Sequence, residues 1–531
     1  MKSRNKPAPK PNAATPGQVP RKENKAPAAA LPIQKEESFI RYVISRPDNR
    51  RYLLAALLIN LVLLLVYKYC YPFPDLNTDG QGYIFAAASN QKVYYRPFGY
   101  ARFLQLLRSF TFGAYAVVAA QYFLVVLAAQ FCFFTTDYFF PFKHKAVKAC
   151  TWLLISVNPV LLVLSNALLS DILFIALSIT WFALLLWTWK RKSWLALLLQ
   201  LVILYWCFQV RYNALYYPLV AAAVFGFAPG MKLPYRLAGA IGSLLLITAT
   251  YTGIKNTTYK TTGADVFAGF SGWQAANNAL FIYKRADIRT EDFDDPELQL
   301  LDKFVKRYID SIPAEEREQI ARNELQNSSF LWNPGSPLKK YLFYYLQKHR
   351  INYFQAWYRV SPLYSKYAMQ IIKDHPEAYF RHFLLPNLWY EFVPTAEFME
   401  KYNGDTAITP LTRQWLDVKG PVPLARAPRL KEALIRPYPV LHGILQLFGL
   451  IVPAVYLIRS RRRQGAWQRD SLLPVLFWYL FLLSDILFSL IAGVVTLRYG
   501  AALFVTGFTL PLVFLDRLLV PRAAKPEPAH A

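Results

Sequence analysis

Long apolar blocks alternate with short polar segments along most of the chain. Each block holds roughly 17–25 residues, the length that an α-helix needs to cross about 30 Å of hydrocarbon. Apolar and polar residues do not alternate with period two inside the blocks, so helices are predicted and not the strands of a barrel. The pattern therefore predicts an all-α polytopic membrane protein with about ten transmembrane helices.

The predicted helices form two modules, one on each side of a long polar region. The N-terminal module, 51–255, holds seven helices, at about 52–70, 111–134, 149–165, 170–189, 194–210, 214–228 and 236–254. The C-terminal module, 437–518, holds three, at about 438–458, 471–494 and 497–517. Between them, 256–436 has mixed charge and many Tyr and Trp, and no apolar run there is long enough to span a bilayer. This region is predicted to be a mainly helical domain outside the membrane.

Charge decides the predicted orientation. The 531 residues carry a formal net charge of +27, which a soluble nucleic-acid-binding protein can also have. Here, however, Lys and Arg cluster at every second loop between the apolar blocks, most strongly at 459–463, and this is the positive-inside pattern of cytoplasmic loops. We therefore expect a multi-pass protein of the inner (cytoplasmic) membrane with both termini in the cytoplasm and 256–436 in the periplasm.

The two chain ends are predicted to be tails. The first residues are rich in Pro, Ala, Lys and Asn, with few large apolar side chains, so 1–50 is predicted to be a disordered basic cytoplasmic tail. A second cytoplasmic tail is expected at 519–531. The four cysteines lie in or beside apolar blocks, which gives no sign of a disulfide framework or a zinc site.

The first predicted outer loop carries a candidate catalytic acid, Asp79, near the membrane–water boundary. Two glycines beside it favour a turn, residues 83–88 predict a short helix on the membrane, and Arg96-Pro97 begins a second turn. A carboxylate with an Arg on the same loop suits a reaction on an anionic lipid-linked substrate, because the acid can accept a proton from an attacking hydroxyl. A solvated loop acid is the plainer interpretation of a lone Asp.

Three further motifs are predicted on the same side of the membrane as Asp79. Asp171 opens the fourth helix, where the helix dipole favours a carboxylate. Arg211 ends the fifth helix, and Arg498 and Tyr499 open the tenth. A guanidinium suits phosphate because it is planar and permanently charged. The plainer interpretations are an N-cap for Asp171 and interfacial anchors for the others.

Together these motifs resemble the GT-C fold glycosyltransferases, which use polyprenyl-phosphate sugars and include the family 39 protein O-mannosyltransferases and the aminoarabinose transferases of lipid A. The resemblance rests on Asp79 with Tyr83, on Tyr95-Arg96-Pro97-Phe98-Gly99-Tyr100, and on Asp171, Arg211 and Arg498-Tyr499, in the order of the family. Phe98 stands where the family commonly has a second Pro. The resemblance implies an enzyme that transfers a hexosyl or pentosyl group from a polyprenyl-phosphate donor to a hydroxyl of a lipid, glycan or protein acceptor on the outer face of the membrane.

The resemblance also implies roles for these residues. Asp79 is expected to be the catalytic base of an inverting transfer, and Asp171 to support it. The two acids are also the possible ligands of a divalent cation, the one cofactor considered, although two carboxylates do not define a metal site. The expected substrate-binding residues are Tyr83, Arg96, Tyr100, Arg211, Arg498 and Tyr499.

The polar region adds a possible sugar site and leaves room for other functions. Trp273 is able to stack on a sugar ring while Gln274 and Asn277 bind its hydroxyls, although ordinary helix surface is the plainer interpretation. A polytopic transporter or lipid-linked glycan flippase is the main alternative, and a non-catalytic scaffold is a third. A transporter would use charges inside its spans, whereas the charges here are predicted at one interface. If the protein is an enzyme, Asp79, Asp171, Arg211 and Arg498 should meet at one cavity.

Overall fold

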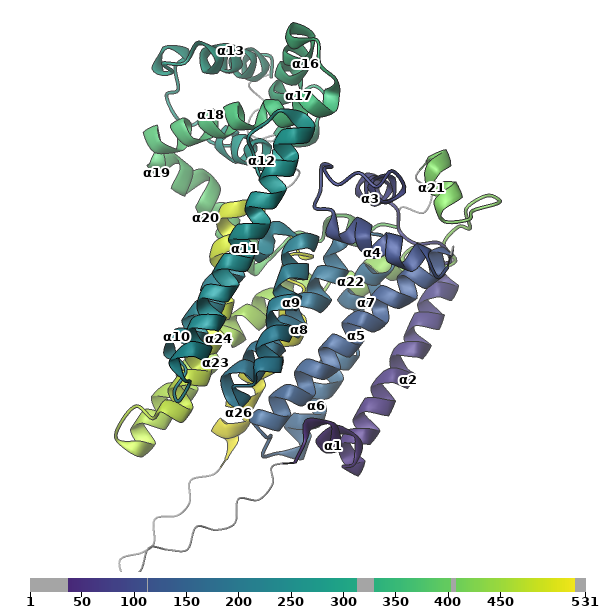
Figure 1. The fold of residues 1–531 in the computed structure, drawn as a ribbon, viewed down its shortest axis with the longest axis vertical. Helices are drawn as coiled ribbons and strands as arrows, with labels where there is room; N and C mark the ends of the chain where they lie inside the picture. Colours follow the sequence, from purple (N-terminus) through teal and green to yellow (C-terminus); the bar gives the residue numbers. More distant parts are fainter. Residues whose placement is uncertain (1–36, 112, 313–328, 403–406, 521–531) are drawn as a thin grey trace, which may run out of the picture.

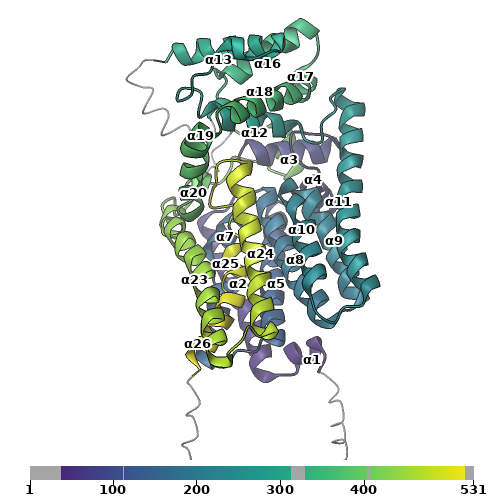
Figure 2. The same cartoon turned by 90° about the vertical axis from the view of Figure 1, so that its left-hand side faces the viewer.

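The computed structural model describes residues 37–111, 113–312, 329–402 and 407–520. Throughout these ranges the regular structure is helical, and the β pairing is limited to two isolated bridges, Asp75–Ala167 and Thr395–Thr496. Figure 1 shows a bundle of long helices with a smaller helical layer above it, and Figure 2 shows the same two layers after a quarter turn. Both ends of the described chain lie at the lower end of the bundle in these views.

Seven helical segments in the described ranges are long and apolar enough to cross a membrane. They are α2 (Pro47–Cys70), α5 (Ala114–Phe139), α6 (Lys145–Ser156) with α7 (Pro159–Ser165), α8 (Ser170–Arg191), α11 (Leu233–Thr262), α22 (Leu430–Ile435) with α23 (Tyr438–Gln464), and α24 (Arg469–Ala492). Two shorter apolar helices, α9 (Trp194–Val210) and α10 (Tyr217–Phe227), lie among them, with the 3-10 turn η1 (Tyr212–Tyr216) between. The chain is thus an all-α membrane protein, and the predicted count of about ten spans is not confirmed.

The third predicted helix is interrupted near its middle. Pro159 lacks the N–H that a continuing helix needs, so α6 ends and α7 begins at this point. The Asn158 side chain caps α7 by accepting hydrogen bonds from the amides of Val160 and Leu161, at 3.1 and 3.3 Å. The Asn158 side chain thus replaces part of the backbone hydrogen bonding that the helix loses at the break.

The tenth predicted helix is not continuous either. Only α25 (Leu503–Thr506) and α26 (Leu510–Leu519) are helical there, and α26 has Pro511 in its first turn. Pro is favoured at the start of a helix and cannot continue one from the preceding turn. Arg498 therefore lies in a turn ahead of α25, where its side chain is not restricted to a helix face.

Part of the predicted disordered tail is ordered. The side chain of Ser38 caps α1 (Phe39–Ile44), and α2 starts at Pro47, within the range 1–50. The reason is a buried anchor, because the Tyr42 hydroxyl donates a 2.5 Å hydrogen bond to Asp137 on α5. The rest of this tail, 1–36, and residues 521–531 of the second one lie outside the described residues.

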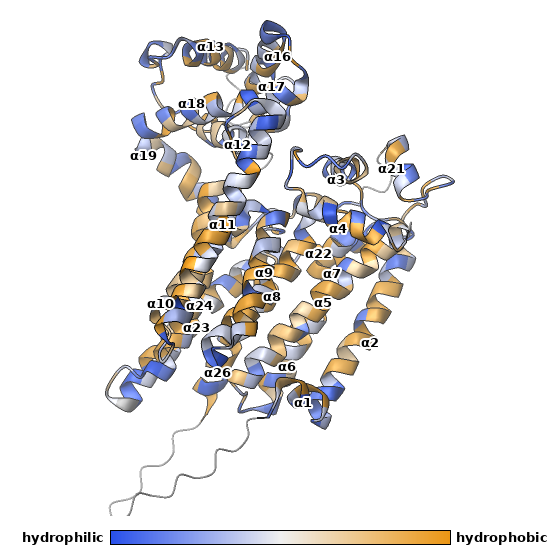
Figure 3. Ribbon diagram, in the orientation of Figure 1, coloured by the Kyte–Doolittle hydropathy of each residue, from blue (hydrophilic) through white to orange (hydrophobic). Residues whose placement is uncertain are grey.

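The polar region forms a helical layer over the upper end of the bundle, and we call residues 264–392 the cap domain. Its helices, together with those of the following connection, are α12 (Gly269–Leu280), η2 (Thr290–Asp292), α13 (Pro296–Asp310), α15 (Ser329–Trp332), α16 (Pro337–His349), α17 (Tyr353–Arg359), α18 (Ser361–Asp374), α19 (Pro376–Tyr379), η3 (Phe380–Leu384), α20 (Leu385–Phe392), η4 (Glu397–Met399) and α21 (Pro410–Trp415). The cap domain has its own aromatic core. Its helices carry more hydrophilic residues than the helices of the bundle below (Figure 3).

The first loop is more helical than predicted, and its docking positions the site. Asp79 lies in the first turn of α3 (Thr78–Ala88), which Asn77 caps and α4 (Gly99–Arg108) follows, so the two glycines beside Asp79 belong to a helix. A Cβ at Gly80 would lie 2.8 Å from the Leu168 carbonyl oxygen, so glycine allows α3 to approach the segment before α8. The Asp75–Ala167 bridge joins the same two segments. This contact brings the start of α3 close to the start of α8.

Candidate functional site

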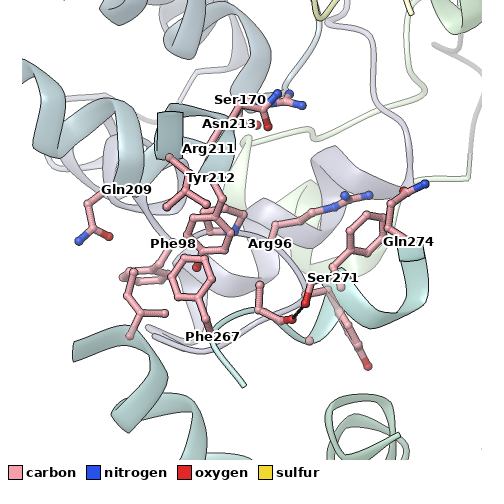
Figure 4. A pocket seen from close by; sticks show the side chains of 18 of the residues that line it. Arg96, Phe98, Ser170, Gln209, Arg211, Tyr212, Asn213, Phe267, Ser271 and Gln274 are labelled. Carbon is pink, nitrogen blue, oxygen red and sulfur yellow. Dashed lines mark hydrogen bonds between the residues drawn. The ribbon is translucent and has the colours of Figure 1, made fainter. Parts of the chain in front are cut away.

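A cavity of about 1150 Å³ is lined by residues from the upper end of the bundle and from the cap domain. Its walls come from α3, the loop 92–99, the start of α8, residues 205–215, α11, α12 and the turn after α24. Asp79, Asp171, Arg211 and Arg498 all line it. Figure 4 shows Arg96, Arg211 and Gln274, from three separate elements, among the side chains of this pocket. The structure thus brings the two predicted acids and the two predicted arginines together.

Asp79 is paired with Arg96. One terminal nitrogen of Arg96, Nη2, lies 2.9 Å from each carboxylate oxygen of Asp79. The same guanidinium lies 5.0 Å from the ring centre of Phe270 and 5.6 Å from that of Trp332, both in cation–π range. Aromatic rings of the cap domain therefore help to hold the arginine that holds Asp79. The pair stays open to the cavity, since the Asp79 side chain is 29% exposed.

Asp171 has two arginine partners and almost no exposure. Its Oδ1 lies 2.5 Å from Arg211 Nη1, and its Oδ2 lies 3.4 Å from Arg498 Nη1. The carboxylate is 4% exposed. The N-cap of α8 is Leu169, without a side-chain capping bond, so the plainer interpretation of Asp171 as an N-cap is not what the structure shows. Its side chain serves the two arginines instead.

A third acid, Glu397, completes this group. It accepts a 2.9 Å hydrogen bond from Arg498 Nε, and its backbone φ of +48° lies in the left-handed region that non-glycine residues rarely adopt. Burial alone would lower the pKa of Arg498, but Tyr499, Asp171 and Glu397 together raise that pKa well above its ordinary value. Tyr499 lies beside both arginines, with its ring centre 4.7 Å from the Arg498 guanidinium carbon and 5.0 Å from that of Arg211.

The two predicted tyrosines of the first loop differ in position. Tyr83 lines the cavity and donates a 2.8 Å hydrogen bond to Ser170 Oγ. Tyr100 does not line it, because it is fully buried and its hydroxyl donates to Gln121 at 3.1 Å. Its ring packs edge-on against Tyr83, 4.9 Å between ring centres. The prediction that Tyr100 binds substrate is therefore wrong, because its buried ring packs against Tyr83 and not into the cavity.

The predicted sugar site on α12 is wrong for two of its three residues. Trp273 is fully buried and stacks on Trp357, with 3.9 Å between ring centres, and its indole N–H donates to the Trp357 carbonyl at 3.0 Å. Asn277, four residues along the same helix face, is buried as well. This face of α12 packs into the cap core. Gln274 lies on the neighbouring face, lines the cavity and donates to Asn278 at 2.9 Å.

The walls of the cavity divide into a charged part and an apolar part. Its described lining includes five cationic side chains, Lys92, Arg96, Arg102, Arg211 and Arg498, against three acids, Asp79, Asp171 and Glu397. The apolar lining residues Trp206, Leu246, Ile254, Phe488 and Ile491 come from other elements, the helices α9, α11 and α24. The cavity therefore suits a ligand with an anionic group at one end and an apolar chain at the other.

Comparison of the chain with protein-family models, curated proteins and solved structures gives no match. Sequence reasoning missed Glu397, which no local pattern marks because its partner Arg498 is 101 residues away. It also missed Lys92 and Arg102, although both flank the motif that holds Arg96 and their charge is visible in the sequence.

The donor set does not fit a divalent cation. Each of the two acids considered as ligands is already bonded to a guanidinium, Asp79 to Arg96 and Asp171 to Arg211 and Arg498. A hard cation takes six or more oxygen ligands, and within the described ranges no group of three His, Cys, Asp or Glu side chains is placed to hold one.

Proposed function

We propose that the protein is an integral membrane glycosyltransferase of the GT-C type. It transfers a sugar from a polyprenyl-phosphate donor to an acceptor hydroxyl at the outer face of the cytoplasmic membrane. The observation that carries this proposal is the meeting of Asp79, Asp171, Arg211 and Arg498 in one cavity. They come from four separate segments of the chain, and interfacial anchors scattered around a bundle have no reason to converge in this way.

The two-part lining supports an amphipathic donor. Arg211 and Arg498 lie in the charged part of the lining, where the single phosphate group of the polyprenyl-phosphate donor would bind. A guanidinium has five N–H donors, and Arg211 uses one of them in a hydrogen bond to a described side chain, Asp171. The polyprenyl chain would contact the apolar lining residues of α9, α11 and α24. Two of these helices, α11 and α24, are long and apolar enough to span the membrane, so the chain could pass from the cavity into the bilayer.

Asp79 is the proposed base. Its carboxylate takes the proton of the acceptor hydroxyl while that oxygen attacks the anomeric carbon and the bond from this carbon to the phosphate oxygen breaks. The electron pair of the broken bond leaves with the phosphate, and Arg211 and Arg498 stabilise its charge. The bonds to Arg96 do not prevent this role, because two carboxylate oxygens offer about four lone-pair sites and Arg96 occupies two.

Asp171 is a positioning residue in this proposal. It is enclosed between Arg211 and Arg498, and it holds both guanidiniums at the cavity wall. An enclosed carboxylate with two cationic partners is a poor proton acceptor, because both partners favour its charged form. Glu397 orients Arg498 from the other side.

The test is the Asp79→Asn variant, purified and assayed with a labelled lipid-linked sugar. Loss of a general base is expected to lower turnover by roughly 10²- to 10⁴-fold. Asp265→Asn, at an exposed acid near the same end of the bundle, is the matched control and should keep wild-type turnover. Wild-type turnover in Asp79→Asn would remove Asp79 from the mechanism. Movement of the labelled donor across vesicle membranes without sugar transfer would instead establish the transporter alternative.

A further inference from the structure

A second pocket lies at the opposite end of the bundle from the cavity. We call it the basic pocket; it has a volume of about 270 Å³ and is lined by Lys143, Tyr456, Arg459, Ser460, Arg463, Ser471, Arg517, Leu518 and Val520. These residues come from the loop between α5 and α6, the end of α23, the start of α24 and the end of α26. Figures 1 and 2 show these helix ends at the lower edge of the bundle, far from the cap domain.

The arginines of the basic pocket are held by neutral groups. Arg459 donates to the Leu518 carbonyl at 3.1 Å, Arg463 to the Val520 carbonyl at 3.4 Å, and Arg517 to the Tyr456 hydroxyl at 3.3 Å. No ion pair within the described ranges involves Lys143 or any of these three arginines. This differs from the cavity, where Arg96, Arg211 and Arg498 each have a carboxylate partner.

One acid beside the basic pocket, Asp516, which precedes Arg517 in the chain, is already in use. Asp516 is fully buried and accepts hydrogen bonds from the backbone amides of Lys143 and His144 and from the ring Nδ1 of His144. Hydroxyl groups also line the pocket, because Ser471 lies 2.8 Å from Ser460 and 3.3 Å from the Tyr456 hydroxyl, oxygen to oxygen. Four cations and three hydroxyls therefore share one small pocket without a carboxylate in its lining.

Apolar surface adjoins the basic pocket directly. Val455, Ile458 and Leu519 lie within a few residues of its arginines and are 45, 50 and 55% exposed. A soluble protein has little reason to expose such side chains beside a cluster of cations, whereas the edge of a bilayer offers acyl chains to the first and phosphate groups to the second. The pocket lies at the ends of spanning helices, the level at which the head groups of a bilayer lie.

We propose that the basic pocket binds the phosphodiester head group of an anionic phospholipid. The phosphate oxygens accept hydrogen bonds from Arg459, Arg463 and Arg517, Lys143 adds charge, and the acyl chains lie on the exposed apolar face of α23. Free inorganic phosphate offers the same oxygens but gains nothing from the apolar surface. The proposal is independent of the function assigned to the cavity.

The test is native mass spectrometry of the full chain in detergent, with phosphatidylglycerol, phosphatidylcholine or inorganic phosphate added. Arg459→Gln with Arg463→Gln is the pocket variant. Arg461→Gln with Arg462→Gln is the matched control, because it removes the same charge from the same turn of α23 at residues outside the pocket lining. Phosphatidylglycerol should bind the pocket variant roughly tenfold or more weakly than the wild type, and the control should bind like the wild type. Phosphatidylcholine should bind more weakly than phosphatidylglycerol to the wild type.

Three results would overturn the proposal. They are equal weakening in the pocket and control variants, equal binding of the two lipids, and tight binding of inorganic phosphate that displaces phosphatidylglycerol. Lys143→Gln provides a variant outside α23, in case the double substitution lowers the melting temperature. It should weaken phosphatidylglycerol binding several-fold and leave the melting temperature unchanged.

Discussion

The cavity contains two carboxylate–guanidinium groups that differ in accessibility. The outer group is Asp79 with Arg96, whose side chains are 29 and 24% exposed. The inner group is Asp171 with Arg211 and Arg498, whose carboxylate is 4% exposed. The same pairing thus occurs once open to the cavity and once enclosed by its partners. In the proposed function this difference assigns proton transfer to Asp79 and the positioning of the arginines to Asp171.

The largest expected effect comes from breaking the inner group. Asp171→Asn keeps the shape of the side chain but leaves two buried guanidiniums without their shared charge. Removing one partner of a buried ion pair costs about 3–5 kcal/mol, so the melting temperature of the purified protein should fall sharply. Asp79→Asn is the comparison and should cost about 1 kcal/mol or less, since its pair is partly exposed. Equal losses in both variants would contradict the distinction between the two groups.

A third carboxylate, Glu391, differs from both groups because it is buried without a guanidinium partner in the described ranges. Glu391 accepts a 2.8 Å hydrogen bond from Gln446. Burial, with a contribution from the charge of Asp485, raises the pKa of Glu391 to about 9. In the unfolded chain the pKa of a Glu side chain is about 4.3. The stability that the neutral Glu391 side chain contributes is therefore complete below that pH, and it is lost as the pH rises towards 9.

Glu391→Gln should therefore stabilise the protein at neutral pH, by up to about 3 kcal/mol. The measurement is the melting temperature of both proteins from pH 5 to pH 9. The wild type should lose stability over this window more steeply than Glu391→Gln, while the curves approach each other at the acid end. Parallel curves would show that Glu391 does not titrate between the folded and unfolded states.

The smallest expected effect on stability comes from the outer group. Arg96→Gln removes the partner of Asp79 and should change stability by about 1 kcal/mol or less. Its effect should fall on turnover, because Asp79 loses the contact that orients it. Arg96→Lys keeps the charge but not the planar guanidinium beside Phe270, so it should restore stability and only part of the turnover. A variant with wild-type turnover would exclude Arg96 from the site.

Much of the membrane part was predictable from the sequence because it depends on local hydrophobicity. The apolar blocks at 52–70 and 170–189 match α2 and α8 within a few residues. The breaks were harder to place. Asn158-Pro159 was visible in the sequence, but a proline inside an apolar run is compatible with a kinked helix as well as with an interrupted one.

The site was predictable where it depends on which helix ends share one side of the bundle, and not where it depends on packing. Asp79, Asp171, Arg211 and Arg498 required only topology. Trp273 could not be assigned, because nothing in the sequence says whether that face of α12 meets the cavity or Trp357. Glu397 depends on an unusual backbone conformation and on a distant partner, so it has no local signal.

The contact between Asp171 and Arg498 joins residues 327 positions apart in the chain. During synthesis, α8 enters the membrane long before the ribosome reaches the final segment, so the nascent protein has only Arg211 to pair with Asp171. The cavity wall is finished by the last part of the chain to be made. A product truncated before residue 498 should therefore insert most of its helices and still lack the completed site, which ties the onset of function to the end of translation.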